Sequence, residues 1–216
     1  AKLLQLVNSA FFGLPQKIDH PGDALIYLGL ENVKALVLSL QVFSLFDRVK
    51  VKQFSLEELW SHSWDVGCLA RQIAACERRP TTEIETAFTA GLLHDVGKLV
   101  LISGVPHGWE EALETAARED LPLWQAERNR LGACHAEAGA ALLSMWGLSD
   151  EIVEAVAFHH EPDHCGSLSF TPLTAVHAAN LLARKQAAAE ESSYFESVGV
   201  RDRMPAWRER FLEPAV

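Results

Sequence analysis

The 216-residue chain is 49% hydrophobic and 22% charged, and its formal net charge is −10 at pH 7. These values fit one globular domain, with or without a small appended lobe, and they exclude disorder over most of the chain. The acidic balance argues against nucleic acid as the main ligand, because a phosphate backbone would be repelled and no basic stripe offsets the repulsion.

Helical periodicity dominates the sequence, and alternating β-branched runs bounded by turn residues are scarce. The sequence therefore predicts an all-α protein. In chain order, the predicted helices are Ala1–Asn8, Pro21–Leu28, Glu31–Phe46, Ser55–Arg78, Thr82–Ser103, Pro106–Glu119, Leu121–Arg130, His135–Trp146, Ser149–His160 and Thr171–Glu191. Ser55 and Ser149 are predicted N-caps, since each precedes acidic residues in the first turn of its helix.

The composition shifts toward Arg, Glu and Pro after the last predicted helix. We therefore expect one helical domain over residues 1–191. Residues 192–216 are expected to form a loosely packed tail or a last helix. Because the first residues are typical of the middle of a helix, the chain is also expected to be incomplete at its N-terminus.

The cysteines and the apolar runs indicate the compartment. The four cysteines show neither a CxxC spacing nor the density of a disulfide scaffold, which favours reduced thiols. No apolar run approaches the ~20 residues that a membrane-spanning helix needs. A cytoplasmic protein without a membrane segment is predicted.

Several ligand-type side chains fall on the apolar faces of the predicted helices. His62 continues the apolar stripe of its helix at about 100° per residue. His94 aligns with the small residues Ala87 and Gly91, and Asp95 follows about 100° further round. All three are therefore predicted to point into the core.

The same pattern recurs later in the chain. His135 shares a face with Gly139, the pair His159 and His160 continues an apolar face, and Asn180 lies on the apolar side of the last helix. Buried without partners, such groups would cost about 1–3 kcal/mol each. Five inward histidines and one aspartate on four helices favour a shared metal site.

A single inward histidine is more often a hydrogen-bonded core residue than a ligand, so the prediction depends on the whole set. Imidazole together with carboxylate suits Fe, Mn, Zn or Ni better than Ca, and one or two divalent ions are expected. His20, His107 and His164 fall in or near loops and are expected to be exposed, without a role. His177 is either a residue that supports the site, through Asn180, or a helix-surface residue.

The ordered set of motifs resembles a known family. The segment Gly91–Lys98, with sequence GLLHDVGK, resembles the central helix of the HD phosphohydrolase superfamily, with His62 upstream of it. His135 and the run His159–Glu161 resemble the further ligands of the HD-GYP branch. Two N-terminal segments, NSAFFG at 8–13 and VKALVL at 33–38, narrow the resemblance to the HDOD domain, the HD-related output domain.

The resemblance implies an HD-like helical bundle, with an HDOD-type N-terminal subregion, 1–50, and an HD-like core, 51–191. Its metal ligands would be His62, His94, Asp95, His135, His159 and His160. Asp95 and Lys98 would be the catalytic residues of any active member. The family also implies an upstream receiver or sensory domain in a bacterial signalling protein.

Two departures from the superfamily pattern stand out. Asn180 replaces the late acid, which makes it a weak or supporting ligand, and no Gly-Tyr-Pro element follows Glu161. Cyclic dinucleotide hydrolysis is therefore not predicted.

Two functions remain in competition. The first is a regulatory output module that acts on a partner protein and keeps the metal cluster as a structural element. The second is a metal-dependent phosphohydrolase acting on a nucleotide or another phosphoester, in which water activated by the metal attacks phosphorus. Lys98 would then bind the phosphate. The alternative for Lys98, at the end of a helical turn where its charge complements the helix dipole, is slightly favoured over phosphate binding. A homodimer is left open, and nucleic-acid binding is the least favoured function.

Overall fold

The computed structural model describes Val33, Val37, residues 54–184 and residues 193–212. The chain divides into two compact units, Ala1–Arg48 and Val49–Val216, and the elements described below belong to the second. All of them are helical, so the predicted all-α class is confirmed. The predicted helices before residue 50 lie outside the described residues, apart from Val33 and Val37, which are helical.

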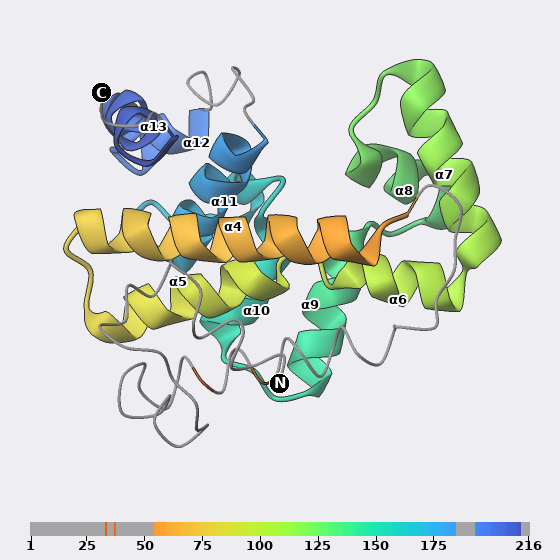
Figure 1. Ribbon diagram of the computed structural model, residues 1–216, viewed down its shortest axis with the longest axis horizontal. Coiled ribbons are helices and arrows are strands. Elements are labelled where there is room, and N and C mark those ends of the chain that lie inside the picture. The colour runs from red at the N-terminus through yellow and green to blue at the C-terminus, as the bar shows by residue number, and fades with distance from the viewer. Residues whose placement is uncertain (1–32, 34–36, 38–53, 185–192, 213–216) are drawn as a thin grey trace. The chain divides into compact units, whose positions relative to one another are not determined.

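The second unit is built of helices joined by short connections (Figure 1). The α-helices are α4 (Leu56–Cys76), α5 (Thr81–Leu93), α6 (Gly97–Gly104), α7 (Pro106–Glu119), α8 (Leu123–Leu131), α9 (His135–Met145), α10 (Asp150–Phe158), α11 (Pro172–Ala183), α12 (Ser193–Ser197) and α13 (Met204–Leu212). Short 3₁₀ helices occupy Pro162–Cys165 (η2) and Arg201–Arg203 (η4). None of these helices is long and apolar enough to cross a bilayer.

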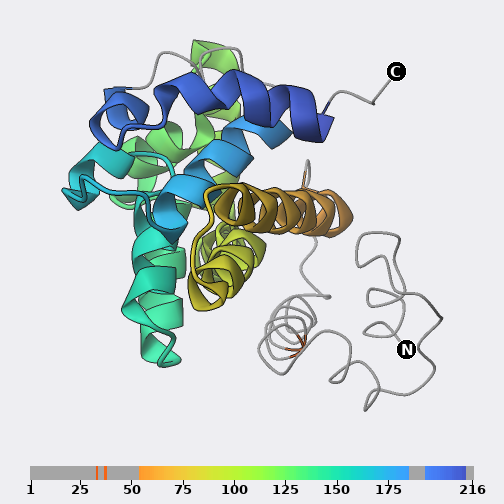
Figure 2. The ribbon, with the colours of Figure 1, turned by 90° about the vertical axis from the view of Figure 1, so that its left-hand side faces the viewer.

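The long helix α4 runs beside α5 and is also packed by α11 (Figures 1 and 2). Its start follows the prediction, because the Ser55 hydroxyl accepts a hydrogen bond from the Glu58 backbone N–H at 3.2 Å. Ser149 is also an N-cap, at the start of α10, but its side chain makes no capping hydrogen bond. The first N-cap is confirmed in full and the second in position alone.

The predicted continuous helix Thr82–Ser103 is wrong, because the chain breaks into α5 and α6 at His94–Val96. The backbone tightens there: the N–H groups of Val96 and Leu99 donate to the carbonyls three residues earlier, at 3.0 Å each. Apolar side chains are buried on both sides of the break, so the hydrophobic pattern continues through it. The break places His94 and Asp95 at a turn inside the core.

Close backbone contact between α6 and α9 explains the glycine that follows the break. A Cβ atom added to Gly97 would lie 1.8 Å from the carbonyl oxygen of His135 and 2.5 Å from the backbone nitrogen of Gly139. Only a residue without a side chain fits between these helices. The contact holds the start of α9, and with it His135, against the turn that carries Asp95.

Among the described residues of this unit, two apolar clusters stand out. The larger one joins α4, α5, α10 and α11 to the C-terminal helices, and a smaller one surrounds Trp109 where α6 meets α7. Of the two alternatives expected after residue 191, the structure has the last helix, α13, and not a loosely packed tail, since Tyr194, Phe195 and Trp207 are at most 3% exposed in the larger cluster. The aromatic side chains decide the packing, and the charged residues between them stay mostly at the surface.

The last predicted helix of the domain, Thr171–Glu191, is observed as α11 up to Ala183, with Arg184 as its C-cap. Residues 185–192 lie outside the described residues. Because Arg184 follows the final turn of α11 directly, its side chain is available to the interior near Asn180, as described below.

Replacing Gly97 by Ala is expected to lower the free energy of unfolding by at least about 3 kcal/mol, because two packed backbones would have to separate. Chemical denaturation monitored by circular dichroism measures the change. Gly104→Ala, at the end of the same helix, is the matched control. Nothing lies within 4 Å of its added Cβ atom, so a gain of up to about 1 kcal/mol is expected. Equal stability of wild type and Gly97→Ala would contradict the packing argument.

Candidate metal centre

The ligand-type residues come from five places in the fold. Asp95 and His94 lie at the α5–α6 break, while His135 begins α9 and His159 follows the end of α10. The remaining members are His62 on α4, His160 after His159, and Asn180 on α11. His94, Asp95, His135 and His159 are no more than 1% exposed. All seven predicted residues converge around one carboxylate, that of Asp95.

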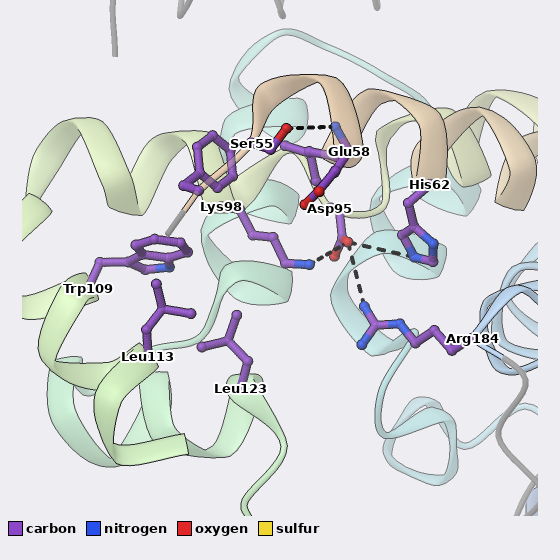
Figure 3. Close-up of a pocket in the computed structure, with 11 residues that line it drawn as sticks. Ser55, Glu58, His62, Asp95, Lys98, Trp109, Leu113, Leu123 and Arg184 are labelled. Carbon is purple, nitrogen blue, oxygen red and sulfur yellow. Dashed lines mark hydrogen bonds and ion pairs between the residues drawn. The ribbon is translucent and has the colours of Figure 1, made fainter. Parts of the chain in front are cut away.

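Oxygen Oδ2 of Asp95 is the more crowded of the two (Figure 3). The Lys98 ammonium donates to it at 2.5 Å, and Nη2 of Arg184 lies 3.7 Å away. Nε2 of His94 and Nε2 of His62 lie 3.4 and 3.9 Å from the same oxygen. Two protein cations therefore share this side of the carboxylate.

Oxygen Oδ1 of Asp95 faces a different set of side chains. Nε2 of His135 lies 3.1 Å from it and Nε2 of His159 lies 3.8 Å from it. Nε2 of His160 is in turn 2.9 Å from Nε2 of His135. Among the described residues, neither a lysine nor an arginine pairs with Oδ1, and its neighbours there are imidazoles.

Two groups of donor atoms have spacings suited to a metal ion. Asp95, His135, His159 and His160 form one, and His62, His94 and Asp95 form the other, with the donor atoms of each group within 4.8 Å of one another. Asp95 belongs to both groups. Imidazole nitrogens with a carboxylate oxygen are the donor set of Fe, Mn, Zn and Ni sites.

The hydrogen bonds of the imidazoles fit such an ion. Nδ1 of His94 donates to the Gly91 carbonyl and Nδ1 of His159 donates to the Val156 carbonyl, each at 2.8 Å. Each bond places the proton on Nδ1 and leaves Nε2 unprotonated, with a lone pair that could bind a metal ion. Both Nε2 atoms and Asp95 Oδ1 are buried without a hydrogen-bond partner. Orphaned acceptors of this kind are what a bound cation would satisfy.

The electrostatics also favour the metal-binding forms. Burial lowers the pKa of His62 to about 4, and it holds the pKa values of His159 and His160 well below the usual range. Burial alone would raise the pKa of Asp95, but His94, Lys98 and the nearby His135 ring hold it well below the usual range. His62, His159 and His160 are therefore neutral and Asp95 is ionised at neutral pH, as metal binding requires. His135 differs: its burial would lower its pKa, but Asp95 and Glu127 raise it, so a metal ion would have to displace a proton from this ring.

Glu127 on α8 is a member of the site that the sequence reasoning missed. Its side chain is fully buried and accepts three hydrogen bonds: from Trp109 Nε1 at 3.0 Å, from the His135 backbone N–H at 2.8 Å and from His135 Nδ1 at 2.5 Å. The last bond turns Nε2 of His135 toward Asp95. The available signal was a glutamate facing the apolar side of a short helix.

His177 supports the site through His159, and not through Asn180 as predicted. It is 7% exposed, and its Nδ1 donates to the backbone carbonyl of His159 at 2.7 Å. It therefore fixes the backbone of a ligand-type residue, and the interpretation as a helix-surface residue is wrong. His107 and His164 are exposed, as expected, with 87% and 67% of their side-chain surfaces accessible. His20 lies outside the described residues.

The slight preference for Lys98 as a residue that complements a helix dipole is also wrong. Because the predicted long helix breaks, Lys98 lies in the first turn of α6, where the dipole disfavours a cation. Its ion pair with Asp95 accounts for its position.

Two cavities reach the cluster. One, of about 350 Å³, has Trp109, Leu113 and Leu123 on one side and His62 and Arg184 across from them (Figure 3). The other, of about 400 Å³, is lined by His135, His159, His160 and Trp124 among others, and the Trp124 ring stacks on His160 at a centroid distance of 5.7 Å. Lys98, Leu123 and Arg184 line both cavities, so the two cations that pair with Asp95 are accessible from each of them.

Replacing Glu127 by Ala is expected to lower the free energy of unfolding by about 3–5 kcal/mol, since three buried donors lose their acceptor. Urea denaturation in the presence of a chelator measures this without any contribution from metal. Glu111→Ala is the matched control: Glu111 pairs with Arg130 at the surface of the same α7–α8 hairpin, and less than about 1 kcal/mol is expected. Similar losses in the two variants would argue against a structural role for Glu127.

The family model of the HDOD domain matches residues 1–162. Among curated proteins, an uncharacterized protein from Treponema pallidum (strain Nichols) is 26% identical over 182 residues, which are 84% of this chain and 35% of that protein. The chain thus spans about a third of the length of this relative.

Several solved structures have a similar fold. An HDOD domain protein with unknown function from Geobacter sulfurreducens matches with a TM-score of 0.69 and 24% identity, over 100% of this chain and 72% of that one. A provisionally named phosphohydrolase from Shewanella amazonensis matches with a TM-score of 0.72 and 20% identity, over 97% of this chain and 86% of that one. The MmoQ response regulator from Methylococcus capsulatus matches with a TM-score of 0.54 and 24% identity, over 94% of this chain and 78% of that one. These structures agree with the helical fold, and the family model, which covers most of the sequence, shows that the chain belongs to the HDOD domain family.

Proposed function

We propose that this chain is a regulatory output domain of a bacterial signal-transduction protein, which binds a divalent metal ion as a structural element and acts through a partner protein. The observation that carries the proposal is the burial of the cluster together with the pairing of Asp95. The four innermost ligand-type residues are at most 1% exposed, and Asp95 already contacts Lys98 and Arg184.

Burial favours a structural role over turnover. The cluster joins α4, the α5–α6 turn, α9, α10 and α11, so an ion bound by these side chains would hold together elements far apart in the sequence. Asp95 and the histidines that face its Oδ1 atom would bind the ion, and Glu127 and His177 would orient two of these histidines. Free energy of metal binding would then contribute to the stability of the fold.

The signalling context is supported by family membership and by the name of one relative in fold, a response regulator. The chain spans 35% of its curated relative, which leaves room for an upstream receiver or sensory domain in the whole protein. A cytoplasmic location and a homodimer are compatible with this role. The net charge of −10 favours a protein partner over nucleic acid.

A metal-dependent phosphohydrolase is the alternative. The two cavities that reach the cluster, with Lys98 and Arg184 between them, favour it, because these cations would bind an anionic phosphoester. Two structures similar in fold, both from Shewanella amazonensis, carry provisional phosphohydrolase names, and one of these names includes metal dependence. A bound divalent ion would supply Lewis-acid stabilisation of a phosphoryl oxygen. Against it stands Asn180, a neutral amide where an acid would strengthen metal binding.

Metal loading and turnover separate the two functions. With free Mn²⁺ or Zn²⁺ at about 100 times Kd, the stability is expected to rise by about 2.7 kcal/mol. For a chain of this size this corresponds to a rise of roughly 5–10 °C in Tm. No turnover is expected on phosphomonoesters, nucleotides or cyclic nucleotides. Differential scanning calorimetry and phosphate or product release are the measurements.

Asp95→Asn keeps the side-chain volume and is expected to abolish the metal-dependent rise in Tm, whereas Asp65→Asn, an exposed aspartate on α4, is expected to keep it. Hydrolysis by the wild type that disappears in Asp95→Asn would overturn the regulatory proposal in favour of the enzyme. An unchanged Tm of the wild type on loading would overturn the metal-binding part.

A further inference from the structure

The two oxygens of Asp95 have unequal surroundings, and this bears on how many ions the cluster can hold. Oδ1 is buried without a hydrogen-bond partner, and it faces only imidazoles, with Nε2 of His135 at 3.1 Å and Nε2 of His159 at 3.8 Å. Oδ2 already accepts from the Lys98 ammonium at 2.5 Å and has the Arg184 guanidinium at 3.7 Å. A divalent ion bound to Oδ2 would lie about 2 Å from that oxygen and so within a few ångströms of both cations. Like charges at that distance repel strongly in a buried site.

The orientation of Asn180 removes a second ligand from the Oδ2 side. Its Oδ1 atom lies 3.0 Å from Arg184 Nε and 3.0 Å from His62 Nε2. Because an arginine nitrogen can only donate, the Asn180 atom between them is the oxygen and not the amide nitrogen. Nε2 of His62 must then donate to it as well. The proton on Nε2 occupies the position that a metal ion would need.

The Oδ2 side therefore keeps a single free imidazole nitrogen, Nε2 of His94. One imidazole and one carboxylate oxygen that already carries an ammonium are too few ligands for a stable divalent site. The Oδ1 side, in contrast, offers His135, His159 and His160 with Asp95, which is a four-ligand set.

We infer that the domain holds one divalent ion, on the Oδ1 side of Asp95 with His135, His159 and His160, and that Lys98 and Arg184 take the place of a second ion on the Oδ2 side. This inference rests on the proposed metal-binding function and goes beyond it in the number and position of the ion. Lys98 and Arg184 are positioning residues that neutralise the shared carboxylate, and His62 belongs to their hydrogen-bond network through Asn180.

Equilibrium dialysis of the purified chain against Mn²⁺, followed by elemental analysis, is expected to give one ion per chain. His159→Ala and His160→Ala are expected to weaken binding by at least ~10-fold, and His62→Ala to change it by less than about 2-fold. His160 lies at the edge of the core and lines a cavity, so its variant is the better choice if His159→Ala fails to fold. Circular dichroism checks the fold of each variant.

The double variant Lys98→Met with Asn180→Asp removes one cation and restores an anionic ligand on the Oδ2 side, and it is expected to bind a second ion. Electron paramagnetic resonance reports the same change, from the spectrum of an isolated Mn²⁺ ion to that of an exchange-coupled pair. Two ions per wild-type chain, or loss of the ion in His62→Ala and not in His160→Ala, would overturn this inference and leave the metal-binding function intact. A wild-type chain that binds no ion would overturn both.

Discussion

The structure depends on an ionised carboxylate placed where water does not reach it. Asp95 is fully buried, and an unpaired charge in that position would cost several kcal/mol. Its neighbours supply the compensation from every side: Lys98 from the next helix, Arg184 from the end of α11 and imidazoles from α4, α9 and the end of α10. The arrangement of helices around the α5–α6 break can be understood as the set of contacts that this one charge requires. Loss of a single partner would leave the charge of Asp95 less well compensated by the remaining ones.

The support for these contacts comes from residues that never touch Asp95. Gly97 lets α6 and α9 approach closely enough to bring His135 to the carboxylate. Glu127 then fixes the ring of His135, and His177 fixes the backbone of His159. Such second contacts determine which nitrogen of each imidazole faces the centre, and this in turn determines which side of Asp95 can accept a cation. The unequal environments of the two oxygens also suit a domain that keeps a bound ion for stability and not for turnover.

Much of the site followed from helical periodicity, because a polar residue on an apolar stripe must point inward wherever the helix packs. Periodicity alone places His62, Asp95 and His159 correctly toward the core. The break at His94–Val96 did not follow, since apolar residues surround it on all sides and the periodic pattern shows no interruption. Glu127 and Arg184 were missed for a different reason: their roles depend on contacts between helices distant in sequence, which no local pattern records. The aromatic residues of the C-terminal segment were outweighed by its charged composition, although their burial decides its packing.

The membership in the HDOD family, the buried cluster and the paired carboxylate together support the proposal that a metal ion in this domain would be part of the scaffold. Anomalous X-ray scattering from crystals of the chain grown with Mn²⁺ tests this most directly, because it locates the ion. The account predicts one peak between Oδ1 of Asp95 and the Nε2 atoms of His135, His159 and His160. A peak beside Oδ2, between His62 and His94, or no peak at the cluster, would contradict it.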